Sequence, residues 1–191
     1  MGKTTLACNM GHEFELPVYV QQCTMAIRPE DLIVIPVLSE KKEIVYRASS
    51  LATAVIKGGI CVLDEANRMN EKAWASLVPL LDYRRYLKSV VAGVKLTAHR
   101  DFRLICVMNE DSSTYIIPEY IQSRISPKIS VGLPSDEDIH RILKKHVGIK
   151  HDAAVIESVA RLLTKKLGSD LALCAFAHKA RSDPRYTVTR R

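Results

Sequence analysis

Four short stretches hold residues whose types and spacing suit the binding and cleavage of a phosphate anhydride. The first, "GKTT" at residues 2–5, matches the second half of the phosphate-binding pattern GxxxxGK(S/T). In an intact loop of this kind backbone amides surround the phosphates, Lys3 reaches the β and γ phosphates, and the Thr4 hydroxyl binds Mg²⁺. The strand and the first glycine of the pattern do not precede Gly2. We therefore expect the chain to begin inside such a loop.

The second stretch, "ICVLDE" at residues 60–65, is an apolar run that ends in two carboxylates. Such a run is typical of a strand buried on both faces, and functional residues gather at the carboxyl ends of parallel strands. Asp64 can then hold Mg²⁺, and Glu65 can polarise the water that attacks a γ phosphate. The alternative is a strand that simply ends in two solvated acids at a loop.

The other two stretches each supply one polar residue. Asn109 ends the apolar run "FRLICVMN", where its amide can help to orient the same water, although asparagine is also a common turn residue. Arg124, in "PEYIQSRISP", lies between a short helix and a proline turn. An exposed guanidinium there can reach a γ phosphate bound by a neighbouring subunit, although an isolated arginine more often forms a surface salt bridge.

Strands and helices alternate over the first two thirds of the chain, and this alternation predicts a parallel sheet with helices on both faces. A short helix is also expected to begin in "IRPEDL", because proline favours a first helical turn. The full set of expected elements comprises helices at residues 2–11, 48–59 and 70–83, strands at residues 15–23, 60–65, 102–110 and 128–133, and hairpins at residues 33–47 and 86–101.

The last third of the chain changes to helical patterns. Ser135 precedes Asp138 by three residues, which is close to a capping box, and two further amphipathic stretches follow. We therefore divide the chain into an α/β core at residues 1–133, a helical subdomain at residues 134–182 and a basic tail at residues 183–191.

Composition narrows the class of protein. A chain of 191 residues with 47% hydrophobic residues can bury one sizeable core and a small appended subdomain. No apolar run approaches the roughly 20 residues of a membrane span, and no signal peptide is visible, so we expect a cytoplasmic protein. The five cysteines are odd in number and form no CxxC pair, which argues against a disulfide framework or a zinc site.

The net charge is +7, from 28 basic and 21 acidic residues. The surplus is spread along the sequence and partly collects in the tail, "ARSDPRYTVTRR". A dispersed surplus usually describes a solvated surface, so we do not expect a nucleic-acid partner.

Taken in this order, "GKTT", "GGICVLDEANRM", "FRLICVMNEDSS" and "PEYIQSRISP" resemble the AAA+ ATPases, and within them the MoxR and dynein-related branch. The resemblance covers nearly the whole chain. It implies an α/β P-loop NTPase fold with three layers around a parallel sheet, here lacking its first central strand, followed by a small all-α lid. The hairpins at residues 33–47 and 86–101 resemble the helix-two and pre-sensor inserts of that branch.

The resemblance also implies ATP and Mg²⁺ as cofactors, with the metal held by Thr4 and Asp64. The family usually has an arginine early in its last lid helix, where this chain has Asp170 and Leu171, and Arg181 comes about three turns later. A second sensor is therefore in doubt. The remaining implied roles are those of Gly2, Lys3, Thr4 and Thr5 as the end of Walker A, Asp64 and Glu65 as Walker B, Asn109 as the first sensor, and Arg124 as the arginine finger.

Members of the family form rings, often hexamers, that hydrolyse ATP between subunits and remodel partner proteins. MoxR-type members frequently act with proteins that carry a von Willebrand factor A domain. The resemblance thus implies a ring-forming ATPase with a chaperone activity. Two alternatives stay open: a non-catalytic ring subunit, and a DNA-directed ATPase that only the charge favours.

Overall fold

The computed structural model describes residues 2–109, 115–132, 135, 137–138 and 141. The chain divides into two compact units, Gly2–Ile129 and Ser130–Arg191. In the second unit the Ser135 hydroxyl accepts a hydrogen bond from the Asp138 amide at 3.2 Å, which is the expected capping contact. The other expectations for that unit lie outside the described residues: the rest of the helical subdomain at 134–182, the tail at 183–191, and Asp170, Leu171 and Arg181.

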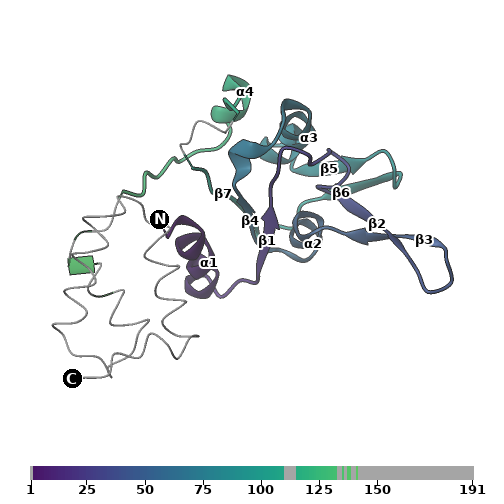
Figure 1. Ribbon diagram of the computed structural model, residues 1–191, viewed down its shortest axis with the longest axis horizontal. Coiled ribbons are helices and arrows are strands. Elements are labelled where there is room, and N and C mark those ends of the chain that lie inside the picture. The colour runs from purple at the N-terminus through teal and green to yellow at the C-terminus, as the bar shows by residue number, and fades with distance from the viewer. Residues whose placement is uncertain (1, 110–114, 133–134, 136, 139–140, 142–191) are drawn as a thin grey trace, which may run out of the picture. The chain divides into compact units, whose positions relative to one another are not determined.

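A sheet of three parallel strands lies at the centre of the first unit, in the spatial order β1-β4-β7 (Figure 1). These strands are β1 (Val18–Gln22), β4 (Gly59–Asp64) and β7 (Phe102–Cys106). Their sequences are rich in β-branched and aromatic residues, which favour strands. Because all three run in the same direction, their carboxyl ends meet at one edge of the sheet.

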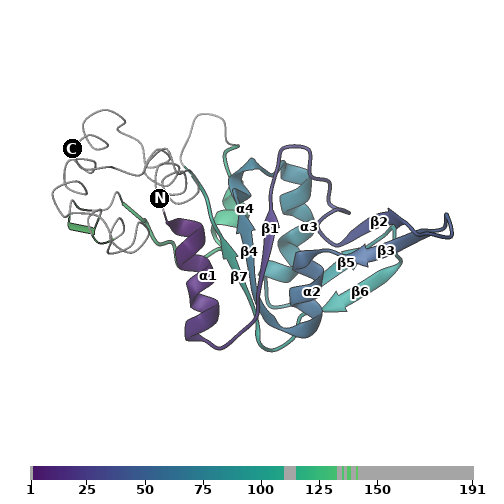
Figure 2. The same ribbon diagram turned by 60° about the horizontal axis from the view of Figure 1, so that its bottom comes forward.

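Helices cover both faces of the sheet, as Figure 2 shows. Helix α1 (Lys3–Glu13) packs against one face, and α2 (Ser50–Lys57) and α3 (Glu71–Leu81) cover the other. Serine and asparagine begin the latter two helices, since the side chains of Ser49 and Asn70 accept hydrogen bonds from the amides three residues ahead. The expected parallel sheet with helices on both faces is confirmed.

The side chains of β4 alternate between the two faces of the sheet, and this alternation shows why the strand is apolar throughout. Ile60 and Val62 pack with Ala7 of α1, whereas Cys61 and Leu63 join the larger core on the opposite face. All four of these β4 side chains are at most 1% exposed. A strand between two helical layers has no solvent face, which is the physical reason for its uninterrupted apolar run.

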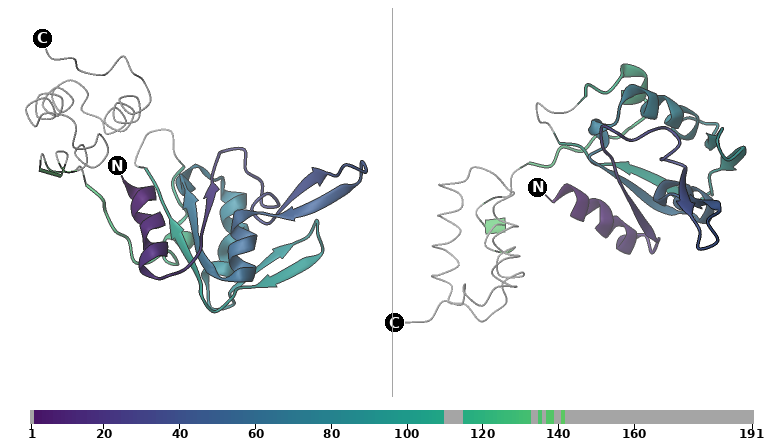
Figure 3. Two further views of the ribbon diagram at one scale, coloured as in Figure 1. Left: turned by 90° about the horizontal axis from the view of Figure 1, so that it is seen from below. Right: turned by 45° about the vertical axis from the view of Figure 1, so that its right-hand side comes forward.

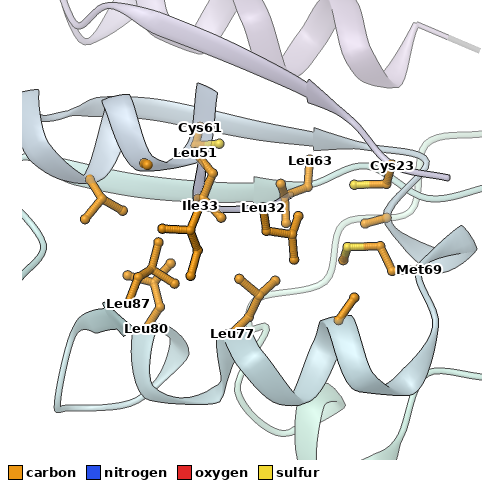
Figure 4. Packing of buried hydrophobic residues seen from close by; sticks show 14 of the residues in the cluster. Cys23, Leu32, Ile33, Leu51, Cys61, Leu63, Met69, Leu77, Leu80 and Leu87 are labelled. Atoms are coloured by element: carbon orange, nitrogen blue, oxygen red, sulfur yellow. The ribbon is translucent and has the colours of Figure 1, made fainter. Parts of the chain in front are cut away.

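The larger core lies between the sheet and helices α2 and α3 (Figure 4). Leu77 and Leu80 of α3 approach Leu32 and Ile33, which come from the turn before the first hairpin. Each fully buried aliphatic side chain of this kind stabilises the fold by roughly 1.5–3 kcal/mol relative to an exposed one. The turn before the hairpin is therefore anchored to the core by its own side chains.

Two antiparallel hairpins leave the α2 and α3 side of the sheet in the same general direction (Figure 3). The first pairs β2 (Val34–Leu38) with β3 (Ile44–Ala48), and the second pairs β5 (Tyr86–Ser89) with β6 (Val94–Thr97). Both were expected from apolar arms around a polar or glycine-containing turn, and both are confirmed.

The first helix, expected to end near Gly11, continues two residues further to Glu13. Gly11 is buried, and a Cβ added there would lie 2.0 Å from Cγ2 of Val18. This glycine therefore permits close approach of the helix to the chain that enters β1, and it does not end the helix.

Two other expected elements do not form. "IRPEDL" contains turns instead of a helix, because the Asp31 carboxylate accepts hydrogen bonds from the amide and guanidinium of Arg28 and the chain enters β2 at Val34. Residues 128–132 are not a strand. A strand needs a neighbour to pair with, and none of the described strands pairs with these residues.

A four-residue helix, α4 (Glu119–Gln122), ends the described elements of this unit. In the part of the chain that the structure describes, no helix has the length and the apolar character needed to cross a lipid bilayer.

Candidate functional site

The site forms at the carboxyl edge of the three-stranded sheet. Backbone hydrogen bonds continue past the strand ends, from the Cys23 amide to the Asp64 carbonyl and from the Val107 amide to the Leu63 carbonyl, both at 2.9 Å. The chain just beyond each strand is therefore held in register with its neighbour. Side chains that follow these strands are placed on a rigid support, which suits a binding or catalytic site.

The amino end of α1 meets this edge. The Thr4 hydroxyl donates a hydrogen bond to Oδ1 of Asp64 at 3.0 Å, although 60 residues separate them in the sequence. Gly2 precedes the helix with a φ of 79°, and a Cβ there would meet no atom within 4 Å. Lys3 and Thr5 lie in the same first turn, where free amides and the helix dipole favour a bound anion.

Glu65 follows β4 in the left-handed region, with φ 54° and ψ 41°. A residue with a Cβ pays of order 1–3 kcal/mol for a sparsely populated conformation of this kind. Its amide donates to Oδ1 of Asp64 at 3.1 Å, and the 3₁₀ turn Ala66–Arg68 begins directly after it. The strained residue thus turns the chain at the end of β4, and the two consecutive carboxylates have different partners.

Two residues that the sequence did not single out hold the Glu65 carboxylate. Nε2 of Gln22 donates to Oε2 of Glu65 at 3.1 Å, and Nε of Arg68 lies 3.2 Å from the same oxygen. Gln22 ends β1 as Asp64 ends β4, and the two are opposite one another in the register. The rule that identified Asn109, a polar residue at the end of an apolar strand, would have found Gln22 as well.

Asn109 lies beyond the end of β7, on the same edge as the two acids. Its main-chain carbonyl accepts a hydrogen bond from Nδ2 of Asn67 at 2.5 Å. Asn67 is 7% exposed, and its Oδ1 has no hydrogen-bond partner among the described residues. The turn that follows Glu65 is therefore tied directly to the backbone of the predicted sensor.

Arg124 does not join this cluster. It is exposed just after α4, and its guanidinium donates to the carbonyl of Tyr120. Hydrogen bonds from Arg84 lower the pKa of Asp82, and the charge of Arg124 adds to this effect. Among the described residues, no hydrogen bond or ion pair joins Arg124 to Asp64 or Glu65.

Cys23 lies beside the two acids without the properties of a nucleophile. Burial and, to a smaller extent, the charges of Asp64 and Glu65 raise the pKa of its thiol to about 12. The thiol therefore stays protonated at neutral pH, and it packs as part of the larger core.

The donor set at this edge fits magnesium. Mg²⁺ prefers hard oxygen ligands and keeps several of its waters, so it needs only one or two protein ligands beside phosphate oxygens. The Thr4 hydroxyl and the Asp64 carboxylate, already 3.0 Å apart, supply such oxygens next to the amino end of α1. Over the described residues, no cluster of three or more histidine, cysteine, aspartate or glutamate side chains could form a closed metal site.

Comparison with known proteins finds relatives in sequence and in fold. Residues 1–125 match the sequence model of the AAA domain (dynein-related subfamily). The denitrification regulatory protein NirQ of Stutzerimonas stutzeri is 32% identical over 108 residues, which are 56% of this chain and 39% of NirQ. An uncharacterized protein of Staphylococcus epidermidis is 29% identical over 113 residues, which are 57% of this chain and 43% of that protein. The chain thus spans about two fifths of the length of these relatives.

Among solved structures, the RuvB Holliday junction branch migration motor of Thermotoga maritima is similar to this chain with a TM-score of 0.64. The match covers 95% of this chain and 51% of RuvB at 14% sequence identity. At that identity the similarity establishes the fold alone.

Proposed function

Because the chain belongs to the dynein-related subfamily of AAA domains, we propose that it binds ATP with Mg²⁺ and supplies the residues that hydrolyse it. The observation that carries the proposal is the hydrogen bond between Thr4 and Asp64, with Glu65 next in the chain. This contact joins the helix start suited to phosphates to the strand end suited to a metal and a general base.

In this proposal each residue at the edge of the sheet has a separate task. The amides of residues 2–5 bind phosphate oxygens, and Lys3 neutralises the β and γ phosphates. Thr4 and Asp64 hold the metal. When bound, Mg²⁺ would neutralise negative charge on the phosphates during cleavage.

Glu65 is proposed to orient the attacking water and to accept its proton. Its carboxylate is engaged by Gln22 and Arg68, so this arrangement corresponds to a resting state that must loosen before Glu65 acts. Asn109 is proposed to orient the same water, since its backbone is fixed to the turn after Glu65 through Asn67.

Arg124 is proposed to act on the ATP of a neighbouring subunit. Its exposure, and its lack of a described hydrogen bond or ion pair to Asp64 or Glu65 of its own chain, suit an arginine that completes a site in trans. This role requires a ring, and we propose a hexamer, as is frequent in the family.

The proposed task of the ring is the remodelling of partner proteins in the cytoplasm. The relationship to NirQ, a protein named for the regulation of denitrification, supports a role in preparing or regulating other enzymes. A protein with a von Willebrand factor A domain is the partner class that the MoxR branch suggests. The alternative is a ring subunit that binds nucleotide without cleaving it, and the engaged state of Glu65 is the observation that favours it.

Calorimetric titration of this chain with ATP and Mg²⁺ tests the proposal. We expect binding that is lost in Lys3→Ala and kept in Lys41→Ala, a matched control in the turn of the first hairpin. Equal binding by wild type and Lys3→Ala, or no binding by wild type, would contradict the proposal for this chain. Where binding is found, Glu65→Gln separates the two candidates: it stalls turnover in an ATPase and changes nothing in a non-catalytic subunit.

A further inference from the structure

The β5–β6 hairpin has an inner face and an outer face of opposite character. Leu87 and Ser89 of β5 are at most 2% exposed, and Leu87 belongs to the larger core. Since side chains alternate along a strand, the outer face carries the remaining pairs, Tyr86 opposite Thr97 and Lys88 opposite Lys95. The buried side chains of the inner face thus hold the hairpin against the core, and the outer face is not needed for packing.

Two lysines directly opposite one another are unfavourable for the hairpin itself. Like charges in a directly opposed pair destabilise an antiparallel ribbon. Nζ of Lys95 lies 4.3 Å from the centre of the Tyr86 ring, a cation-π contact that holds the charge over the outer face. In the described part of the chain, no carboxylate lies within 4 Å of Lys88 or Lys95.

The segment around this hairpin also holds much of the net charge. Residues 82–103 contain six basic and two acidic residues, so they carry four of the seven net positive charges of the chain. Both acids have arginine neighbours, Asp82 with Arg84 at 2.6 Å and Asp101 with Arg100 at 3.5 Å. The six basic residues are all exposed: Arg84, Arg85, Lys88, Lys95, Arg100 and Arg103.

We propose that the outer face of the β5–β6 hairpin binds the phosphate backbone of single-stranded nucleic acid. Lys88 and Lys95 contact neighbouring phosphates, and Tyr83, which is 91% exposed just before the hairpin, offers its ring to a base. The charge looked dispersed in the sequence because its members are spread over residues 84–103. The hairpin places Lys88 directly opposite Lys95, seven residues later in the chain.

The composition of this face favours nucleic acid over an acidic protein. Lysine is depleted in protein–protein interfaces, whereas interfaces with nucleic acid are more polar and far more positively charged. The exposed apolar side chains of the hairpin are confined to its turn and the adjoining strand end, at Val90, Val91 and Val94. The outer face of the paired strands therefore lacks the apolar centre that a protein partner would need.

Fluorescence anisotropy with a labelled single-stranded DNA of mixed sequence tests the inference. The variant is Lys88→Gln with Lys95→Gln, and the matched control is Lys41→Gln with Lys42→Gln, two exposed lysines in the turn of the other hairpin. Both double variants lower the net charge equally and leave the basic tail unchanged. The assay needs no ATP, so its failure is separate from a failure of the proposed function.

We expect the hairpin variant to bind at least about tenfold more weakly at about 50 mM salt, and its salt slope to fall by about 1.4, as the loss of two phosphate contacts predicts. Tyr83→Ala should weaken binding several-fold without changing that slope. The glutamine variants relieve a repulsion, and unchanged circular dichroism would verify that they fold.

Three results would overturn the inference. If the wild-type protein does not bind the DNA, the face is not a nucleic-acid site. If both double variants weaken binding equally, only a general effect of charge is left. Tighter binding of poly-glutamate than of DNA, with the same dependence on Lys88 and Lys95, would assign the face to an acidic protein.

Discussion

The two hairpins leave the same side of the sheet but relate to the core in different ways. In β5–β6 the alternate side chains of β5 are buried, whereas in β2–β3 only Val34 is buried and every residue of β3 is exposed. Yet β2–β3 is the more apolar of the two. Its exposed apolar residues are Ile35, Leu38, Ile44, Val45 and Tyr46.

The difference teaches that apolar content does not decide which hairpin packs. In β5–β6 successive side chains alternate between the two faces, and the apolar residues gather on the face toward α3 and the core. In β2–β3 apolar residues occupy both faces of the ribbon, and the pairs Val37–Val45 and Leu38–Ile44 lie directly opposite each other across the strands. The first hairpin is therefore held at its base, and the second along its length.

The largest expected effect on this comparison comes from truncating one leucine side chain in each hairpin and measuring the loss of stability. Leu87→Ala should lower the free energy of unfolding by about 2–5 kcal/mol, because it leaves a cavity in the core. Leu38→Ala, at a position that is 66% exposed, should cost less than about 0.5 kcal/mol. Urea unfolding measures both, and equal losses would show that the first hairpin also packs along its length.

A second pair of variants compares the base of one hairpin with the turn of the other. The buried hydroxyl of Ser49 donates to the Leu32 carbonyl at 2.6 Å and accepts from the Ala52 amide at 3.0 Å, so it caps α2 and anchors the start of β2. Ser49→Ala should cost about 1–2 kcal/mol. Ser89, also buried, accepts one bond from the Ala92 amide at 3.2 Å, and Ser89→Ala should cost less in the same unfolding assay.

A smaller effect of opposite sign is expected at the paired lysines. Lys88→Gln should raise the free energy of unfolding by about 0.2–1 kcal/mol, because it removes a repulsion between directly opposed charges. The gain should shrink as salt is added, since the pair is exposed. Thermal unfolding of Lys88→Gln and Lys41→Gln at two salt concentrations measures this, and a destabilised Lys88→Gln would contradict it.

The smallest expected effect concerns pH, because both hairpins follow an aspartate that is bonded to an arginine. Hydrogen bonds from Arg28 lower the pKa of Asp31, and hydrogen bonds from Arg84 lower the pKa of Asp82. A lowered folded pKa contributes stability above the unfolded pKa, near 3.9, and this stability is lost as the pH falls through the folded pKa.

Carboxyl titrations followed by NMR should therefore give midpoints below about 3.9 for both aspartates. Arg28→Gln should restore an ordinary midpoint at Asp31 alone, and Arg84→Gln should do so at Asp82. If either variant shifted the midpoints of both aspartates, the two aspartate–arginine pairs would not be independent.

The sequence predicted those parts of the fold and the site that depend on local pattern. The apolar run that ends in Asp64 and Glu65, the hairpins and the capped helices follow from periodicity and from turn residues. The Gln22 contact with Glu65 depends on which strands are neighbours, and a single sequence does not show this. The prediction of a strand at residues 128–132 was wrong for the same reason, because a strand forms only where a partner strand lies beside it.

The left-handed backbone at Glu65 should make two selections favour different residues at this position, one for folded protein and one for ATP cleavage. In a library randomised at this position and sorted only for folded protein, glycine and asparagine should be enriched, because they adopt a φ near 54° with least strain. The same library sorted for ATP cleavage is expected to retain glutamate. Sequencing both pools would show at one codon whether strain is tolerated for the sake of chemistry.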